Sequence, residues 1–474
     1  MNPAVMARAS LAASWRPLLL AVAVAGAVLL LTRLLLGLLI QYPAPDGDSV
    51  LFASVAHYHC GTGRFETPIF PLDPAGGIRY VWHGIGHPAL LSWLSPTCDV
   101  AGLYLAQTLI LLAAGALAWL TVAPRRGQLL AVLFALVVMT LLAKQGFRPE
   151  TSATVLALLA EWMRARQRST AWALAVGLQA WVQPTTFILY LAWVLASADA
   201  AELRRLLRQA PVWLPSSLLL QAGLWLLYPF PLHDLLQGLS QQGQSFAQRS
   251  DGSFFLYLIR SDFFPLFGLL FAAAFAQVAA WRPRVVLLLP LLWFYGWRVP
   301  PTYYNLVPVF AWLLLALLLR EEAGTAGTSD TDRRPVATVL AGALLATGGL
   351  SQSALRDVNS WLQYGTTQTV ARAQWQSLRS QGLVACAVPA HFTLMLPADA
   401  FERSHTPRLL ACGLAPEWQR RDLVSSVAMK NRPDAGACTQ WPQRHGLPGV
   451  DKVFRSDSGY GFHVCPARTE GAAR

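Results

Sequence analysis

Apolar residues in this chain are gathered into long blocks separated by short polar segments. A helix needs about 20 mainly apolar residues to cross roughly 30 Å of hydrocarbon. Segments starting at 151, 169, 185 and 284 are shorter than that, so we expect them to tilt little or to thin the bilayer locally. The pattern predicts about eleven spans, at 17–40, 100–122, 127–143, 151–163, 169–182, 185–199, 211–229, 264–281, 284–297, 304–319 and 335–353.

The apolar blocks stop after about residue 355, which divides the chain into two predicted domains. Residues 1–354 should form a polytopic membrane bundle of helices. Residues 355–474 mix short apolar runs, such as 382–389 and 453–464, with Pro, Gly and cysteine, a pattern typical of a small α/β domain joined by disulfides. We therefore expect a mainly α protein whose tail has an accessory role.

Composition agrees with a membrane protein. Hydrophobic residues make up 54% of the chain, charged residues only 13%, and the mean hydropathy is +0.40. A soluble domain of this length cannot bury so much apolar surface. Residues 17–40 do not read as a cleaved signal peptide, because the small residues Ala21 to Ala23 lie inside an apolar run that continues well beyond them.

The net charge of +12 has a topological explanation, so we predict no nucleic-acid partner. With the N-terminus in the cytoplasm, every arginine cluster between the blocks falls on the inner side, as the positive-inside rule requires. Loop 41–99 and the C-terminal domain then lie outside. We predict a multi-pass protein of a bacterial inner membrane with a periplasmic tail. The inner clusters are Arg8 with Arg16, Arg125 with Arg126, Arg164 with Arg166 and Arg168, Arg204 with Arg205 and Arg208, Arg282 with Arg284, and Arg333 with Arg334.

The six cysteines test this topology independently, because all of them fall in the two exterior regions. Cys60 and Cys98 lie in loop 41–99, and an even number in each region suggests that these two pair. The tail carries four more, which suggests two bridges whose pairing among three alternatives the spacing leaves open. The other interpretation is that these are buried free thiols. The tail cysteines are Cys386, Cys412, Cys438 and Cys465.

Loop 41–99 contains the most promising chemistry. Asp46 and Asp48 precede residues 49–60, whose apolar positions suit a helix lying along the membrane surface. Asp48 would stand at the start of that helix. One interpretation is that its carboxylate only caps the helix by accepting backbone N–H bonds. The other is that it takes part in a reaction.

The loop resembles the first exterior loop of the GT-C glycosyltransferases, which include protein O-mannosyltransferases and the aminoarabinose transferases of lipid A. Two departures matter: Ser49 stands where the family often has a second acid, and Ala89 where it has a second proline. The resemblance covers about the first 320 residues. It rests on Asp48, Phe52, Ala56, Gly61, Trp82-His83, His87-Pro88-Ala89-Leu90, Arg33, Phe147-Arg148-Pro149-Glu150, Gln183-Pro184, Arg298, Tyr304 and Pro308.

The resemblance implies an inverting transfer of a hexosyl or pentosyl group from a polyprenyl-phosphate donor to a lipid, glycan or protein acceptor on the outer side. Inversion needs a base on the sugar face opposite the phosphate, and Asp48 is the candidate. Arginine suits the leaving phosphate because its planar fork binds two oxygens. The candidates for phosphate or substrate contacts are Arg33, Arg148, Glu150, Arg249, Arg260, Arg298 and Tyr304, with Asp46, His83 and His87 as loop contacts.

Arg33 lies within the first predicted span, so snorkelling of its guanidinium to the interface is an equally good explanation. His83 and His87 are four residues apart and would share a helix face, which leaves a divalent metal as an option. No third ligand stands at a suitable spacing, so we assign neither a metal site nor any other cofactor. Hydrogen bonding within the loop, or contact with substrate, is the preferred role of both histidines.

Two other functions compete with an enzyme. A transporter or flippase of a lipid-linked saccharide would also have many spans, but it should carry polar residues near mid-membrane or an internal repeat. Here the polar candidates concentrate in exterior loops, and the sequence shows no repeat. A catalytically inactive membrane scaffold is the third interpretation, and the single acid at position 48 is the best argument for it.

Overall fold

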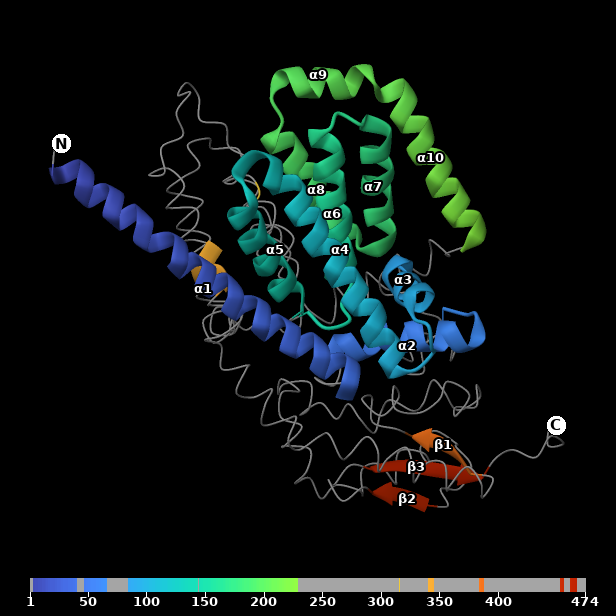
Figure 1. Ribbon diagram of the computed structural model, residues 1–474. Helices are drawn as coiled ribbons and strands as arrows, with labels where there is room; N and C mark the ends of the chain where they lie inside the picture. The colour runs from blue at the N-terminus through green and yellow to red at the C-terminus, as the bar shows by residue number, and fades with distance from the viewer. Residues whose placement is uncertain are drawn as a thin grey trace, which may run out of the picture.

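The computed structural model describes residues 3–40, 47–65, 84–143, 145–228, 315, 340–344, 383–387, 452–455 and 461–466. Within these residues the chain is mainly α-helical, as the sequence predicts (Figure 1). The helices are α1 (Pro3–Ile40), α2 (Gly47–Thr62), α3 (Gly86–Leu94), α4 (Val100–Arg126), α5 (Gln128–Ala143), α6 (Glu150–Ala165), α7 (Ser169–Val182), α8 (Pro184–Ser197), α9 (Ala200–Arg208) and α10 (Ala210–Leu227).

Capping side chains, a glycine and a proline define several of the helix ends. Asp99 caps α4, its Oδ1 accepting from the Gly102 amide at 2.9 Å, and Asp199 caps α9 by accepting from the Glu202 amide at 2.7 Å. Gly127 ends α4 with φ +85°, a backbone conformation that residues with a Cβ rarely adopt. Pro184 opens α8, where its missing N–H costs no helical hydrogen bond.

The core of the bundle lies where α4, α5, α6 and α7 pack together (Figure 1). Small residues on α4 and α6, such as Ala114, Ala118, Ala157 and Ala160, are fully buried there. Small side chains let membrane helices approach closely, where packing rather than water exclusion holds them together. Bulkier side chains of α5, including Phe134, fill the remaining space.

Seven of the predicted spans coincide with helices α1, α4, α5, α6, α7, α8 and α10. By length and composition, three described helices can cross a membrane: 17–39 of α1, all of α4 and all of α10. None of α10 is buried, which suits a helix facing lipid. The other predicted spans lie outside the described residues, apart from helical positions 315 and 340–344, so the total of eleven stays a prediction.

The two ends of the bundle differ in character. We call one the arginine end, because it carries the α4–α5 and α6–α7 turns and α9, which hold the arginines of 125–126, 164–168 and 204–208. The other, which we call the disulfide end, carries α2, α3, the α5–α6 turn and the α7–α8 turn (Figure 1). Successive bundle helices therefore run in alternate directions between the two ends, as the predicted topology requires.

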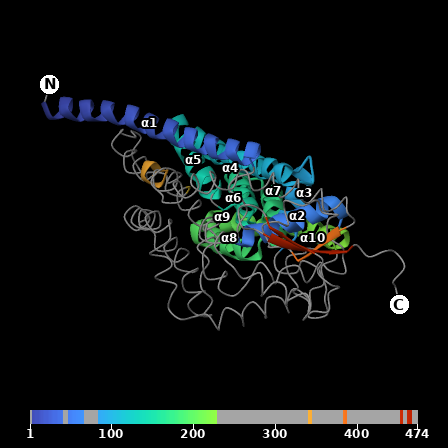
Figure 2. The ribbon, with the colours of Figure 1, turned by 90° about the horizontal axis from the view of Figure 1, so that it is seen from below.

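Helix α2 is enclosed by protein to a degree that the sequence does not predict, while its orientation along the membrane surface stays a prediction. Its residues 52–58 are all buried, so no face of this stretch is exposed. A helix that is apolar on all sides is one that is surrounded by protein. The small residues Ala53, Ser54 and Ala56 allow that close packing, and α2 lies beside α3 (Figure 2).

The described part of the tail is a three-stranded antiparallel sheet in the order β1-β3-β2, formed by β1 (Leu383–Ala387), β2 (Lys452–Arg455) and β3 (Gly461–Pro466). Val384 pairs with Cys465, and a register shift follows Ala385, at the position of Cys386. These strands fall in or beside the short apolar runs of the sequence. The complete α/β domain and its disulfides stay predictions, because Cys412 and Cys438 lie outside the described residues.

Sidedness can be measured with two single-cysteine variants at exposed positions, in a background whose other cysteines are replaced. Pro184→Cys lies at the disulfide end and Gln128→Cys at the arginine end. We expect a membrane-impermeant maleimide to label position 184 in spheroplasts and position 128 only after the membrane is opened. The reverse pattern would overturn the predicted topology.

Candidate functional site

The turn between α5 and α6 is the centre of the candidate site. It leaves α5 after Ala143, passes through Gly146 with φ +59°, and reaches Glu150 at the start of α6. A Cβ built at Gly146 would lie 2.7 Å from the Ser49 hydroxyl of α2. Glycine therefore serves both the backbone conformation and the close approach of α2.

Arg148 and Glu150 form a buried two-point ion pair in this turn. Arg148 Nη2 donates to Glu150 Oε1 at 3.1 Å, and Nε donates to Oε2 at 3.2 Å. Gln183, from the α7–α8 turn, donates its amide to the same Oε1 at 3.0 Å and accepts from the Thr186 hydroxyl. Two buried charges are tolerated because the paired geometry and these further hydrogen bonds offset the loss of water.

Aromatic contacts join α2 to this ion pair. The Arg148 guanidinium carbon lies 6.0 Å from the centre of the fully buried Phe52 ring, within reach of a cation–π interaction. The same ring meets His87 edge-on, with 6.2 Å between ring centres. Phe52 stands one helical turn after Asp48, so the first turn of α2 lies next to the charged pair.

His87 of α3 is fully buried and bonded at both ring nitrogens. Nε2 donates to the Phe147 carbonyl at 2.7 Å, so in the neutral ring Nδ1 accepts from the Ser152 hydroxyl at 2.8 Å. Burial lowers the pKa of His87 to about 4, with Arg148 acting in the same direction, although the Phe147 carbonyl and Glu150 oppose the shift. The histidine is therefore neutral at physiological pH and holds the α5–α6 turn.

Two more side chains fasten the same turn. Ser49 of α2 donates to the Gln145 carbonyl at 3.2 Å. Gln107 of α4 donates to the Gly146 carbonyl and lies 3.3 Å from the Thr151 hydroxyl. Helices α2, α3 and α4 and the α7–α8 turn thus all bond to residues 145–152, which makes this segment the junction of the disulfide end.

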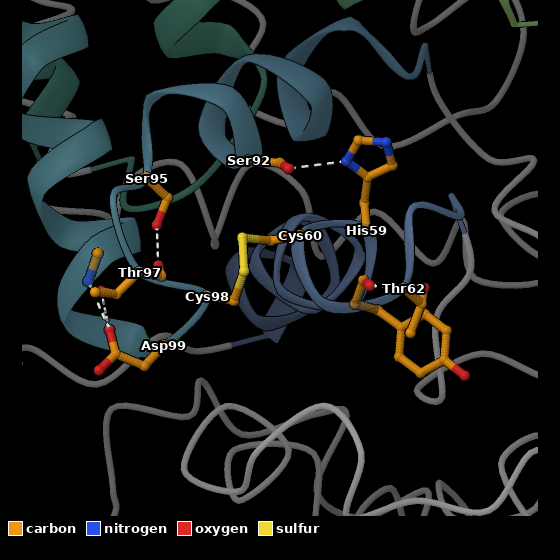
Figure 3. The surroundings of a disulfide bond; sticks show 10 residues. His59, Cys60, Thr62, Ser92, Ser95, Thr97, Cys98 and Asp99 are labelled. Atoms are coloured by element: carbon orange, nitrogen blue, oxygen red, sulfur yellow. Dashed lines mark hydrogen bonds between the residues drawn. A yellow bond between two sulfur atoms is a disulfide. The ribbon is translucent and has the colours of Figure 1, made fainter.

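The predicted Cys60–Cys98 disulfide is confirmed and ties the end of α2 to the residues before α4 (Figure 3). Its Cα atoms are 5.3 Å apart across a sequence separation of 38. Next to it, His59 Nδ1 bonds Ser92 of α3 at 2.8 Å (Figure 3). The C-terminal end of α2 is therefore fixed covalently, while its first turn is fixed by Ser49 and Phe52.

Of the candidates from the sequence, the structure brings His87, Arg148 and Glu150 together. The backbone of Asp48 lies in the first turn of α2, as predicted. Arg33 lies near the end of α1 and is half-buried. The other candidates lie outside the described residues: Asp46, His83, Arg249, Arg260, Arg298 and Tyr304.

The hydrogen bonds of His87 need one correction. The sequence favours bonding within loop 41–99 or contact with substrate, but both hydrogen-bond partners belong to residues 147–152. Since both ring nitrogens are engaged, His87 does not offer a lone pair to a metal. The described residues contain no group of three His, Cys, Asp or Glu side chains arranged to hold a metal ion.

Sequence reasoning missed Gln107, Ser152 and Thr186. One signal was available for Gln107, because an amide inside the apolar block 100–122 is costly unless it is hydrogen-bonded. Ser152 and Thr186 are short hydroxyl side chains whose partners are distant in sequence. Nothing in the local pattern distinguishes them from ordinary helix residues.

Comparison with known proteins identifies a fold. No protein-family model and no curated protein matches the chain. Among solved structures, the chain is similar to ArnT from Cupriavidus metallidurans in the apo state, with a TM-score of 0.53 and 14% sequence identity. The alignment covers 96% of this chain and 98% of that one. The two chains therefore share an architecture over almost their whole lengths.

The buried His87 makes a pH-dependent contribution to stability. Its folded pKa of about 4 lies below the ordinary 6.5, so its contribution is complete above pH 6.5 and is lost as the pH falls toward 4. We expect the wild type to lose on the order of 3 kcal/mol more unfolding free energy over that range than His87→Gln, which cannot titrate. Chemical unfolding in detergent measures this; His59→Gln, at a half-buried histidine whose pKa burial also lowers, should reduce the pH dependence less than His87→Gln. Parallel pH profiles for wild type and His87→Gln would contradict the assignment.

Gly146→Ala should loosen the first turn of α2, because the new methyl group displaces the Ser49 hydroxyl. Gly127→Ala is the matched control, since φ is also positive there but a Cβ would meet nothing within 4 Å. Both should lose about 1–2 kcal/mol of stability through backbone strain. Only Gly146→Ala should speed amide hydrogen exchange in residues 47–52, measured by mass spectrometry. Equal exchange in the two variants would mean that Ser49 does not hold this turn.

Proposed function

We propose that this protein is a membrane glycosyltransferase that moves a sugar from a polyprenyl-phosphate donor to an acceptor on the outer side of the membrane. The observation that supports it most is the buried Arg148–Glu150 pair beside the first turn of α2, in a chain whose fold resembles ArnT. ArnT is an aminoarabinose transferase of the GT-C class. The proposal is for the reaction class, since the site does not identify the sugar or the acceptor.

Asp48 is the proposed general base. Positions 48 and 52 of a helix share a face, and Phe52 is the residue on which the Arg148 guanidinium and the His87 ring converge. A carboxylate at position 48 takes the proton of the acceptor hydroxyl as the hydroxyl oxygen bonds the anomeric carbon and the bond from that carbon to the leaving phosphate breaks. Ser49, the neighbour that replaces the family's second acid, has a structural bond to the Gln145 carbonyl instead.

Arg148 is the proposed contact for the leaving phosphate, with Glu150 and Gln183 as positioning residues. Glu150 engages two donors of the guanidinium and fixes its plane, and Gln183 fixes Glu150. An arginine that is already oriented loses little side-chain freedom when an anion arrives. Its burial also strengthens its attraction for a phosphate in comparison with an arginine in water.

The donor follows from where the site lies. If the disulfide end faces the periplasm, nucleotide sugars do not reach it, and the activated sugar must arrive on a lipid carrier. Helices α1 and α10, whose apolar side chains are largely exposed, provide a surface along which a polyprenyl chain can lie. The phosphate of such a lipid sits at the membrane surface, near the level of α2 and α3.

The test compares wild type with Asp48→Asn. Purified protein is incubated with a panel of polyprenyl-phosphate sugars and with lipid and peptide acceptors, and the transferred sugar is counted. We expect Asp48→Asn to lower the transfer rate at least about 100-fold while donor binding is retained. Asp99→Asn is the matched control: it removes one carboxylate from the same exterior loop, keeps an acceptor oxygen that can cap α4, and should leave the rate within a few-fold.

The other outcomes discriminate between the alternatives. Equal transfer by wild type and Asp48→Asn would remove Asp48 as the base and leave the reaction class intact. Donor binding without transfer to any acceptor would favour a transporter. No binding of any lipid-linked sugar would contradict the proposed function and favour the scaffold.

A further inference from the structure

A second polar site lies at the arginine end of the bundle, far from the α5–α6 turn. It is a small cavity, open to solvent, between the α6–α7 turn and the end of α9. Figure 1 shows α9 crossing the ends of the helices there, opposite α2 and α3. The polar side chains that line the cavity are Arg164, Gln167, Arg168, Ser169, Arg205 and Gln209.

The cavity is positively charged, because arginines line it while the glutamates that pair with them do not. Arg164 Nη2 lies 2.9 Å from Glu161, which also accepts from the buried Tyr190 hydroxyl at 2.9 Å. Glu202 lies 3.8 Å from Arg164 and 3.5 Å from Arg205. Neither glutamate lines the cavity, whereas both arginines do.

Arg168 adds a cation without a matching acid. It lines the cavity, and within the described part of the chain no carboxylate lies within ion-pair distance of it. Between Glu161 and Arg208 the sequence has six arginines, no lysine and three acids. An anion of one or two charges would bring this region closer to neutrality.

The α6–α7 turn places Gln167, which is not a glycine, in the left-handed backbone conformation. The Arg168 amide bonds the Met163 carbonyl at 3.0 Å, and the Gln167 amide bonds the Arg164 carbonyl at 3.0 Å. This is the Schellman motif, in which glycine usually takes the left-handed position. Here Gln167 takes it, with φ +59°, at a cost of about 1–2 kcal/mol. The sequence thus keeps an amide side chain at the cavity where glycine would be more stable.

Helix α9, which borders the cavity, has the features of a helix at a membrane surface. Helix α9 is amphipathic, with Arg204 and Arg208 exposed and the apolar Leu207 70% exposed, as expected of a helix at a membrane surface. Trp213 donates to the Leu206 carbonyl at 2.8 Å and stacks edge-on against Trp172 of the cavity wall. Tryptophan is typical of the membrane–water interface.

We propose that this cavity binds a phosphate-bearing anion, held by Arg168 and Arg205 and by the amide of Gln167. The phosphate group is the chemistry that three arginines and neutral hydrogen-bond donors recognise. It has two sources at this surface: the headgroup of an anionic phospholipid, or a soluble phosphate. The site is separate from the proposed glycosyltransferase site and does not depend on that function.

The experiment uses the full-length protein in a neutral detergent and measures binding by native mass spectrometry and by thermal stabilisation. The probes are a short-chain phosphatidylglycerol, the matching phosphatidylcholine, and inorganic phosphate. The test variant is Arg168→Gln with Arg205→Gln. The matched control is Arg166→Gln with Arg204→Gln, which removes the same charge from the same turn and helix but from residues outside the cavity lining.

We expect the test variant to weaken phosphatidylglycerol binding at least about tenfold and to abolish its stabilising effect. The control should remain within about twofold of wild type. Gln167→Gly should fold at least as well as wild type and still lose affinity for phosphatidylglycerol, which separates a binding role of Gln167 from a structural one.

Tighter binding of phosphatidylglycerol than of inorganic phosphate assigns a lipid headgroup, and the reverse order assigns a soluble phosphate. Equal losses in test and control variants, or equal binding of phosphatidylcholine, would overturn the proposal.

Discussion

The buried ion pair between Arg148 and Glu150 is the interaction on which the disulfide end of this protein depends. Two opposite charges removed from water are stable only while each keeps its partner and its remaining hydrogen bonds. Glu150 obtains its second bond from Gln183, and Arg148 lies against Phe52. Segments that are far apart in sequence are therefore held in one arrangement by a pair of side chains separated by a single proline.

This constraint explains why the α5–α6 turn is so heavily bonded. His87, Ser49 and Gln107 each hold a carbonyl of the turn, and the Cys60–Cys98 disulfide fixes the far end of α2. The result is a preorganised arrangement in which Ser49 bonds the first turn of α2 to the turn that carries the Arg148 guanidinium. Preorganised charge is what a transfer reaction needs, because groups that are already in place do not have to reorganise as charge moves.

The sequence predicted the bundle better than it predicted the site. The lengths of the apolar blocks located the long helices α1, α4 and α10 closely, because the length of such a block is set by the bilayer itself. The sequence also paired Cys60 with Cys98. It did not foresee that α2 is buried on all sides, nor that His87 bonds across to Phe147 and Ser152. Such contacts depend on how helices pack, and neither residue spacing nor composition records them.

We propose that a lipid-borne phosphate meets this protein beside the first turn of α2 and the α5–α6 turn. The most direct measurement is photo-crosslinking with a polyprenyl phosphate that carries a diazirine close to its phosphate, followed by peptide mapping of the labelled protein. The account predicts crosslinks within residues 47–65 and 145–152, reduced by an excess of unlabelled polyprenyl phosphate. Crosslinks that fall only on α9 and α10, or that no competitor reduces, would contradict it.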